Sequence, residues 1–113
     1  MQTNINLETV KIRKMNDHLR KYGVGGQIVV TRGILSLEKP VQAQIVSAVR
    51  DFNQFTPHND TYGKHDFGQV IVCGIKAFWK IDYYDQNLRY GSDDPSNPQI
   101  TKRVLTIMLA EEY

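Results

Sequence analysis

The sequence predicts an α+β fold, in which a small antiparallel sheet, made of a central hairpin and one or two short strands, packs against about three helices. Apolar residues recur at helical spacing before residue 53. Two strand-like runs, Phe67–Cys73 and Lys76–Tyr84, flank Gly74, which suits a tight turn. The 113 residues can bury one core but not two, so we expect a single domain over residues 1–113.

The first third of the chain is predicted to form a helix and a strand. Leu7–Tyr22 carries a loose apolar stripe, with capping candidates from Thr3 to Asn6, and the glycine-rich residues 23–26 end it. Its basic residues are expected on a solvated outer face, with an acidic partner or a nucleic acid as the alternative explanation: Lys11, Arg13, Lys14, Arg20 and Lys21. Gln27–Thr31 is β-branched and predicts a strand, which Ile34–Leu37 continues as a bent or second short strand.

A second helix is expected to begin near Pro40 and to end before Pro57. Its apolar residues recur at helical spacing: Val41, Ile45, Val49 and Phe52. A long polar loop then covers residues 53–66. After the hairpin, Leu88 and Tyr90 are candidates for a short edge strand. A last helix is expected from about Ile100, with Val104, Leu105, Met108 and Leu109 on its buried face.

The turn of the hairpin decides which side chains face each other. With Gly74-Ile75 as a type II′ turn, Val70 opposes Trp79 and His65 opposes Tyr84. Gly68 leaves room beside Trp79 and Ile81. One face of the hairpin is apolar and the other becomes polar towards its open end. The predicted core comprises Ile45, Val49, Val70, Val72, Trp79, Ile81, Leu105 and Leu109.

The polar open end of the hairpin is the predicted binding surface, and its residues are His65, Asp66, Lys80, Asp82, Tyr84 and Asp85. A histidine near a carboxylate can serve acid–base chemistry, so an enzyme would use His65, Lys80, Asp82 and Tyr84. A metal site would use His58, Asp60 and His65, with Asp82 as a further candidate, although their spacing matches no known metal motif. The structural alternative is a set of cross-strand pairs that fix the register of the hairpin.

Composition narrows the classes of function. The net charge of +2 is too small to argue for nucleic acid by itself, although Lys76 and Lys80 alternate with Phe78 and Tyr84 on the polar face. Cys73 is the only cysteine, which excludes an internal disulfide and a cysteine-based zinc cage. The sequence contains no apolar run long enough to cross a bilayer and no secretory signal pattern. We therefore expect a cytoplasmic protein without a membrane partner or cofactor.

These patterns favour a non-enzymatic module that binds a protein partner. A cluster of acidic residues after the hairpin could engage a basic surface on that partner: Asp82, Asp85, Asp93 and Asp94. The alternatives are a small enzyme or metal-binding protein that uses the His/Asp cluster, and a nucleic-acid-binding protein.

Four motifs are long and unusual: NDTYGKHDFG at residues 59–68, FWKIDYYD at 78–85, GSDDP at 91–95 and TKRVLTIMLAEEY at 101–113. Together they resemble an uncharacterised proteobacterial small-protein family, domain of unknown function 3768, from about Asn16 to Tyr113. The family pattern usually has Pro where this chain has Thr61 and Glu where it has Lys64. The resemblance implies no activity. Such genes resemble accessory cargo of bacterial chromosomes and mobile elements, which suggests by analogy an inhibitor or regulator, for example of a host defence system in the manner of an anti-CRISPR.

Overall fold

The computed structural model describes residues 6–113 and has the predicted α+β fold. Its elements in chain order are α1 (Leu7–Tyr22), β1 (Gln27–Val30), α2 (Arg32–Leu35), α3 (Lys39–Asp51), β2 (Phe67–Val72), β3 (Ile75–Tyr84), β4 (Lys102–Leu109) and the 3₁₀ turn η1 (Ala110–Glu112). Asn6 caps α1, because its side-chain oxygen accepts hydrogen bonds from the backbone N–H groups of Glu8 and Thr9. The other capping candidates, residues 3–5, lie outside the described residues.

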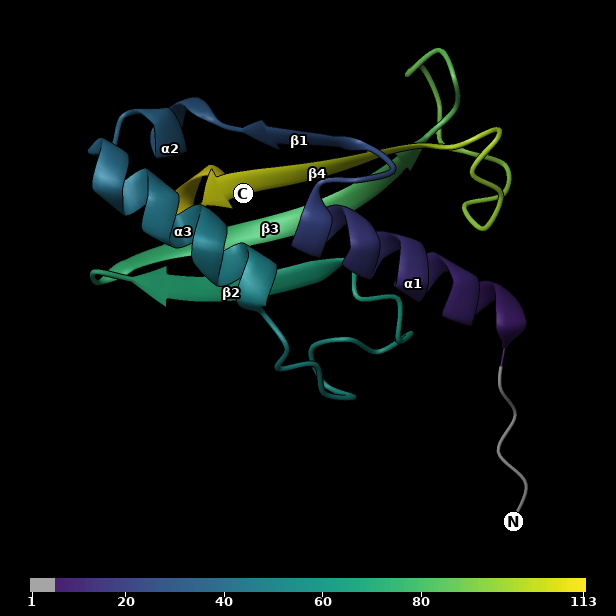
Figure 1. Cartoon of the computed structure of the whole chain (residues 1–113), viewed down its shortest axis with the longest axis horizontal. Coiled ribbons are helices and arrows are strands. Elements are labelled where there is room, and N and C mark those ends of the chain that lie inside the picture. Colours follow the sequence, from purple (N-terminus) through teal and green to yellow (C-terminus); the bar gives the residue numbers. More distant parts are fainter. Residues whose placement is uncertain (1–5) are drawn as a thin grey trace.

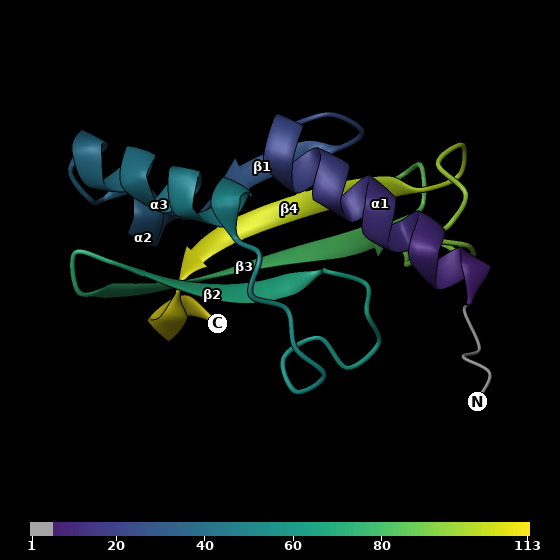
Figure 2. The ribbon, with the colours of Figure 1, turned by 60° about the horizontal axis from the view of Figure 1, so that its bottom comes forward.

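The four strands form one mixed sheet in the order β1-β4-β3-β2. Strands β2, β3 and β4 are antiparallel neighbours, whereas β1 runs parallel to β4. The helices pack on one face of this sheet, and η1 lies on the other side (Figures 1 and 2). Within residues 6–113, no helix is long and apolar enough to cross a membrane.

The core lies between the sheet and the helices, with Trp79 fully buried at its centre. Six of the eight predicted core residues are buried: Ile45, Val49, Val70, Trp79, Ile81 and Leu105. Val72 and Leu109 are partly buried and pack against this cluster. The prediction for Gly68 is confirmed at Trp79, since a Cβ at Gly68 would meet the indole ring.

The register of the hairpin differs from the predicted one. The turn is Cys73-Gly74, and both residues have positive φ, 52° and 76°, as a type I′ turn requires. Trp79 therefore opposes Gly68 instead of Val70. This pairing gives the indole ring the space that a Val70 side chain would fill. Because the slip is two residues, each side chain stays on its predicted face while every opposed pair changes.

The segment after Ile100 was expected to be a helix, and this prediction is wrong. It forms β4, which lies between β1 and β3. A central strand is apolar over most of its length, and such a run cannot be distinguished from a buried helix by periodicity alone.

Two shorter strand predictions are also wrong. Ile34 belongs to the single helical turn α2, where it is fully buried against the core, instead of to a strand. The segment around Leu88 and Tyr90 is a turn, joined to β3 only by an isolated bridge between Tyr84 and Gly91.

Candidate functional site

The predicted site residues lie on both faces of the sheet. Lys80, Asp82 and Tyr84 alternate along β3 with the side chains that point into the core, so they point away from the helices. His65 and Asp66 precede β2 and contact residues on the helix-covered side. The structure therefore does not bring His65 together with Lys80, Asp82 and Tyr84, because β2 begins only at Phe67 and His65, with its positive φ, lies outside the strand ladder.

His65 ties the long loop to α1. Its Nδ1 lies 2.8 Å from Asp17 Oδ1 and its Nε2 lies 3.5 Å from Asp60 Oδ2. The ring stacks on Phe55, with centroids 3.6 Å apart and planes at 4°. The backbone of His65 has a positive φ of 54°, a strained conformation for a non-glycine residue, and its N–H donates to Asp60 Oδ1. Both ring nitrogens thus face carboxylates, an arrangement that holds the loop in place.

A buried polar network lies between α1 and the sheet. Asn16 is fully buried, and its Nδ2 donates to the Tyr83 hydroxyl at 2.8 Å and to the Lys64 carbonyl at 2.9 Å. Asn16 Oδ1 accepts a hydrogen bond from Arg103 Nε at 3.1 Å. The Tyr83 hydroxyl donates to Asp66 Oδ2 at 2.9 Å. Burial, with the negative charge of Asp66 as a second cause, raises the pKa of Tyr83 above its usual range. Asp66, which is partly buried, is therefore a hydrogen-bond partner of Tyr83 on the helix-covered side of the sheet.

Arg20 was expected on the solvated face of α1, and this prediction is wrong. Its side chain is buried, and Nη1 donates to the carbonyl oxygens at the end of α3, those of Val49, Arg50 and Phe52, at 3.1, 3.0 and 2.8 Å. A cation is favourable there because the last carbonyls of a helix lack intrahelical donors. The signal in the sequence was the helical spacing of Asn16 and Arg20 from Ile12, which places both polar residues on the buried stripe.

The sheet face opposite the helices, here called the open face, gathers apolar and charged side chains. Its residues from β2, β3, β4 and the chain after η1 are Phe67, Ile71, Lys76, Phe78, Lys80, Asp82, Tyr84, Lys102, Met108 and Tyr113, and β1 adds Val29 at the edge. The rings of Phe67, Phe78 and Tyr113 contact one another, with centroids 5.4 to 5.7 Å apart. Met108 lies directly opposite Phe78. The sequence did not reveal this cluster, because Met108 was assigned to a helix.

An ion pair between two residues of β3 lies in the middle of the open face. Lys80 Nζ lies 2.9 Å from Asp82 Oδ2 along the same strand. The hydrogen bond and the charge of Asp82 raise the pKa of Lys80. The two residues were expected to be a cross-strand pair, whereas each has its own partner on β4, Thr106 for Lys80 and Val104 for Asp82.

The remaining predicted residues form turns. Asp85 accepts hydrogen bonds from the backbone N–H groups of Asn87 and Arg89, both at 3.1 Å, and so closes the turn after β3. The backbone N–H of His58 donates to Thr56 Oγ1 in another turn. In the part of the chain that the structure describes, no three His, Cys, Asp or Glu side chains are arranged to hold a metal ion.

Comparison with known families gives one match. The family model described as a protein of unknown function, DUF3768, matches residues 30–112. The chain belongs to this family. The match begins later than Asn16, where the resemblance was expected to start. No curated protein and no solved structure matches the chain.

The DUF3768 match covers the open face more fully than it covers the buried polar residues on the helix side. It contains β2, β3 and β4, and with them almost all of the open face. It does not contain α1, which supplies Asn16, Asp17 and Arg20 to the interior. Lys64 contributes its main-chain carbonyl to the network. That contact needs no particular side chain at this position.

Proposed function

We propose that this DUF3768 chain is a non-enzymatic protein-interaction module that binds a protein partner through its open face. The observation that carries the proposal is the aromatic cluster of Phe67, Phe78 and Tyr113 on a sheet face opposite the helices. Ile71 on the same face is 63% exposed. Tyr113 is 73% exposed, Phe67 and Phe78 are partly exposed, and Met108, which opposes Phe78, is buried. Apolar surface that includes aromatic side chains is typical of protein interfaces.

The charges around the cluster indicate the chemistry of the partner. Lys76 and Lys102 are exposed on the same face, whereas Lys80 is already paired with Asp82. The rim of the apolar centre carries both signs of charge, because η1, on the same side of the sheet, adds the exposed Glu111 and Glu112. A complementary surface would have an apolar centre with acidic side chains opposite Lys76 and Lys102, because opposite charges at the rim speed encounter and fix orientation.

The same face supports a protein partner better than a nucleic acid. The rings of Phe67, Phe78 and Tyr113 lean against one another at angles of 47° to 87°, so they do not form a row of parallel platforms. Binding of single strands relies on free ring faces and on a basic groove along the backbone. The ion pair with Asp82 removes Lys80 from such a groove.

An enzyme has less support from the geometry. His65 has carboxylates at both ring nitrogens and lies on the face of the sheet opposite Lys80 and Asp82. Acid–base chemistry needs the proton-transferring groups within reach of one substrate atom. We further propose that binding inhibits or regulates a bacterial macromolecular complex. This part of the proposal rests on the resemblance to small accessory proteins, which is an analogy.

Affinity capture from the native host, with matched variants, tests the proposal. Ile71→Asp places a charge on the open face, and Leu7→Asp does the same at a 73% exposed apolar residue on α1. We expect one protein to be captured by the unmodified chain and by Leu7→Asp, and to be depleted about tenfold or more by Ile71→Asp. Thermal melts of both variants check that they are folded.

Two outcomes would contradict the proposal. The first is equal recovery of every captured protein by all three chains. The second is capture of DNA or RNA that falls steeply as salt rises, which would show phosphate contacts and a nucleic-acid function instead.

A further inference from the structure

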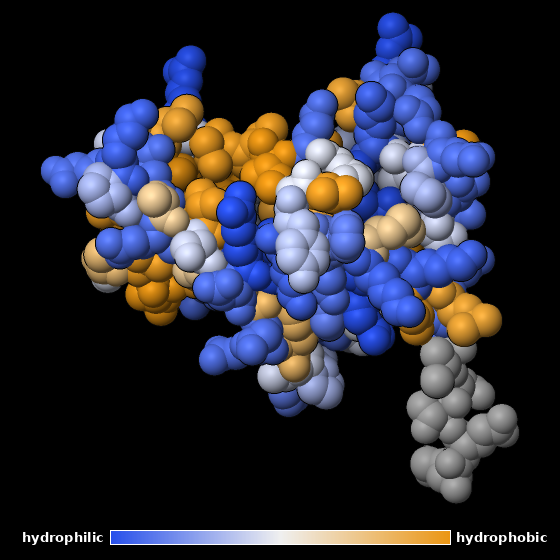
Figure 3. All heavy atoms as spheres, in the orientation of Figure 1, coloured by the Kyte–Doolittle hydropathy of each residue, from blue (hydrophilic) through white to orange (hydrophobic). Residues whose placement is uncertain are grey.

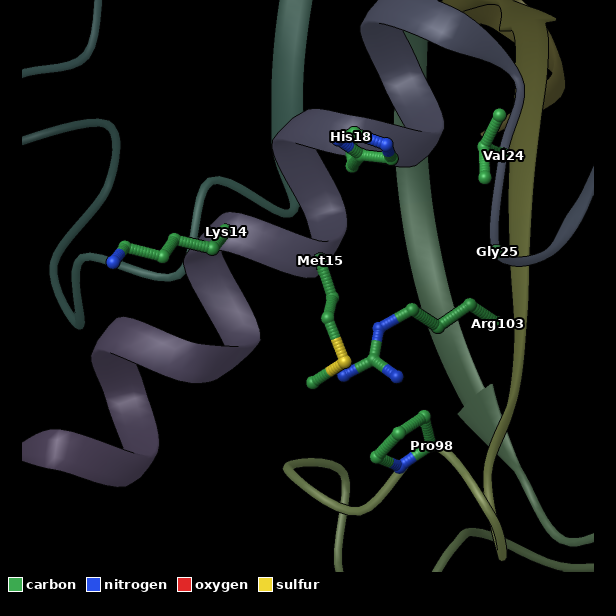
Figure 4. A pocket seen from close by; sticks show the side chains of 7 residues that line it. All are labelled: Lys14, Met15, His18, Val24, Gly25, Pro98 and Arg103. Carbon is green, nitrogen blue, oxygen red and sulfur yellow. The ribbon is translucent and has the colours of Figure 1, made fainter.

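A cavity of about 420 Å³ lies at one end of the molecule, between α1, the glycine-rich residues 23–26 and the beginning of β4 (Figure 4). Its lining residues are Lys14, Met15, His18, Val24, Gly25, Pro98 and Arg103. The space-filling view shows this side of the molecule as a mixture of apolar patches and polar ridges (Figure 3). The cavity is separate from the open face, and its volume is in the range of small-molecule sites.

Arg103 gives the cavity a buried positive charge. The residue is only 2% exposed, although its guanidinium reaches the cavity between Met15 and Pro98 (Figure 4). Its partners are neutral: Nε donates to Asn16 Oδ1, Nη2 donates to the carbonyl of Pro95, and the ring of Tyr83 lies 5.3 Å from the guanidinium carbon.

Arg103 therefore lacks a counter-charge. Among residues 6–113, no carboxylate forms an ion pair with Arg103, and Nη1 has no hydrogen-bond acceptor. Burial lowers the pKa of Arg103, which reflects the unfavourable desolvation of this cation. A buried cation is costly unless an opposite charge and further hydrogen bonds compensate it.

The residues that line the cavity with Arg103 are basic or uncharged. Lys14 and His18 line it from α1, with the Lys14 ammonium extending away from the guanidinium (Figure 4). A neighbouring hollow of about 320 Å³ shares Arg103 and adds Lys102. Within the described residues, neither space is lined by Asp or Glu. The side chains nearest the guanidinium are apolar, because it lies between Met15 and Pro98, and Val24 lines the cavity farther away (Figure 4).

We propose that this cavity binds a small organic carboxylate, whose acidic group pairs with Arg103 and whose apolar body lies against Met15, Val24 and Pro98. The guanidinium fork matches the geometry of a carboxylate. Met15, which adjoins the guanidinium, is unbranched and can change rotamer to admit the ligand. The ligand supplies the negative charge and the acceptors that the protein interior does not give to Arg103.

Titration of the ¹⁵N-labelled full chain with benzoate, followed by NMR, tests this site. We expect weak binding, with shifts of the backbone amides of Gly25 and Gly26 and of the Arg103 Nε–H signal. Benzamide has the same ring without the charge, and its affinity should be lower than that of benzoate by a factor of about ten or more. The amide of Ile71 on the open face should not respond.

A pair of variants at one residue isolates the role of charge. Replacement of Arg103 could unfold the protein through Asn16, so the substitutions are made at Val24, which is half exposed at the rim. Val24→Glu should weaken benzoate binding about tenfold relative to Val24→Gln. Equal affinity of the two variants, equal affinity for benzamide, or absence of shifts at the Arg103 signal would overturn the proposal.

Discussion

The ring of Tyr113 stands edge-on to the ring of Phe78, with centroids 5.5 Å apart and planes at 87°. This contact secures the segment after η1 against the open face, where Tyr113 also touches Phe67. Edge-to-face pairs of aromatic rings stabilise proteins beyond the area that they bury. The cluster therefore contributes to stability as well as to the proposed interface.

Replacement of Tyr113 tests the stabilising part of that role. Tyr113→Ala should lower the free energy of unfolding in urea by about 1 kcal/mol, because it removes two ring contacts. Tyr90→Ala is the control, since Tyr90 is equally exposed but lies in a turn after β3. Equal losses of stability for the two variants would show that the Tyr113 contacts contribute nothing.

Gly68 is expected to tolerate no side chain. Gly68→Ala would drive a methyl group into the indole of Trp79, so the free energy of unfolding should fall by about 1 to 3 kcal/mol. Trp79 is the only tryptophan, and its fluorescence reports the unfolding transition. Gln69→Ala, at the next and exposed position, should change stability far less. Wild-type stability for Gly68→Ala would contradict the observed register.

Arg20 is expected to stabilise the end of α3 strongly. Arg20→Met removes three hydrogen bonds to carbonyl oxygens and the ion pair with Asp17. It should lower the free energy of unfolding by about 3 kcal/mol. Arg50→Met is the control on the exposed surface of α3. Hydrogen exchange at Phe52 should also quicken, because its N–H closes the last turn of α3. Similar losses in both variants would be incompatible with capping by Arg20.

Titration of Tyr83 should lower the free energy of unfolding of the protein at alkaline pH. Its pKa is raised in the folded protein, above the ordinary value of 10.0, so the unfolded chain loses the phenolic proton first. The contribution of Tyr83 is therefore complete below about pH 10 and is lost as pH rises towards the folded pKa. Tyr83→Phe should be about 1 kcal/mol less stable at neutral pH, since Asn16 and Asp66 lose a partner.

Urea unfolding at several pH values between about 8 and 11 checks this prediction. The difference in stability between the wild type and Tyr83→Phe should shrink as the pH rises. The other tyrosines and the lysines cancel in that difference because both proteins contain them. A constant difference over the whole range would mean that Tyr83 titrates normally in the folded state.

The two faces of the hairpin could be predicted from the sequence because side chains alternate strictly along a strand. That rule placed Val70, Trp79 and Ile81 in the core and Lys80 outside it. It could not decide the register, since a slip of two residues leaves every face unchanged. The predicted pairing of His65 with Tyr84 failed for a second reason: β2 begins only at Phe67, and His65, with its positive φ, lies outside the ladder and contacts Asp17 instead.

The partners of the buried polar residues could not be predicted from local patterns. Arg20 is buried because three carbonyl oxygens from α3 converge on it, and these belong to residues about thirty positions away. Asn16 likewise finds Tyr83 and Arg103 on two different strands. Such pairings appear only when the chain is folded, because neither partner leaves a signal near the other in the sequence.

Photo-crosslinking in the native host tests most directly whether the open face binds a protein. A photoreactive phenylalanine analogue is placed at Ile71 or, as the control, at Leu7, which has a similar exposure at the start of α1. We predict an adduct with one recurrent protein from position 71 and none with that protein from position 7. The same adduct from both positions, or none from position 71, would contradict the account.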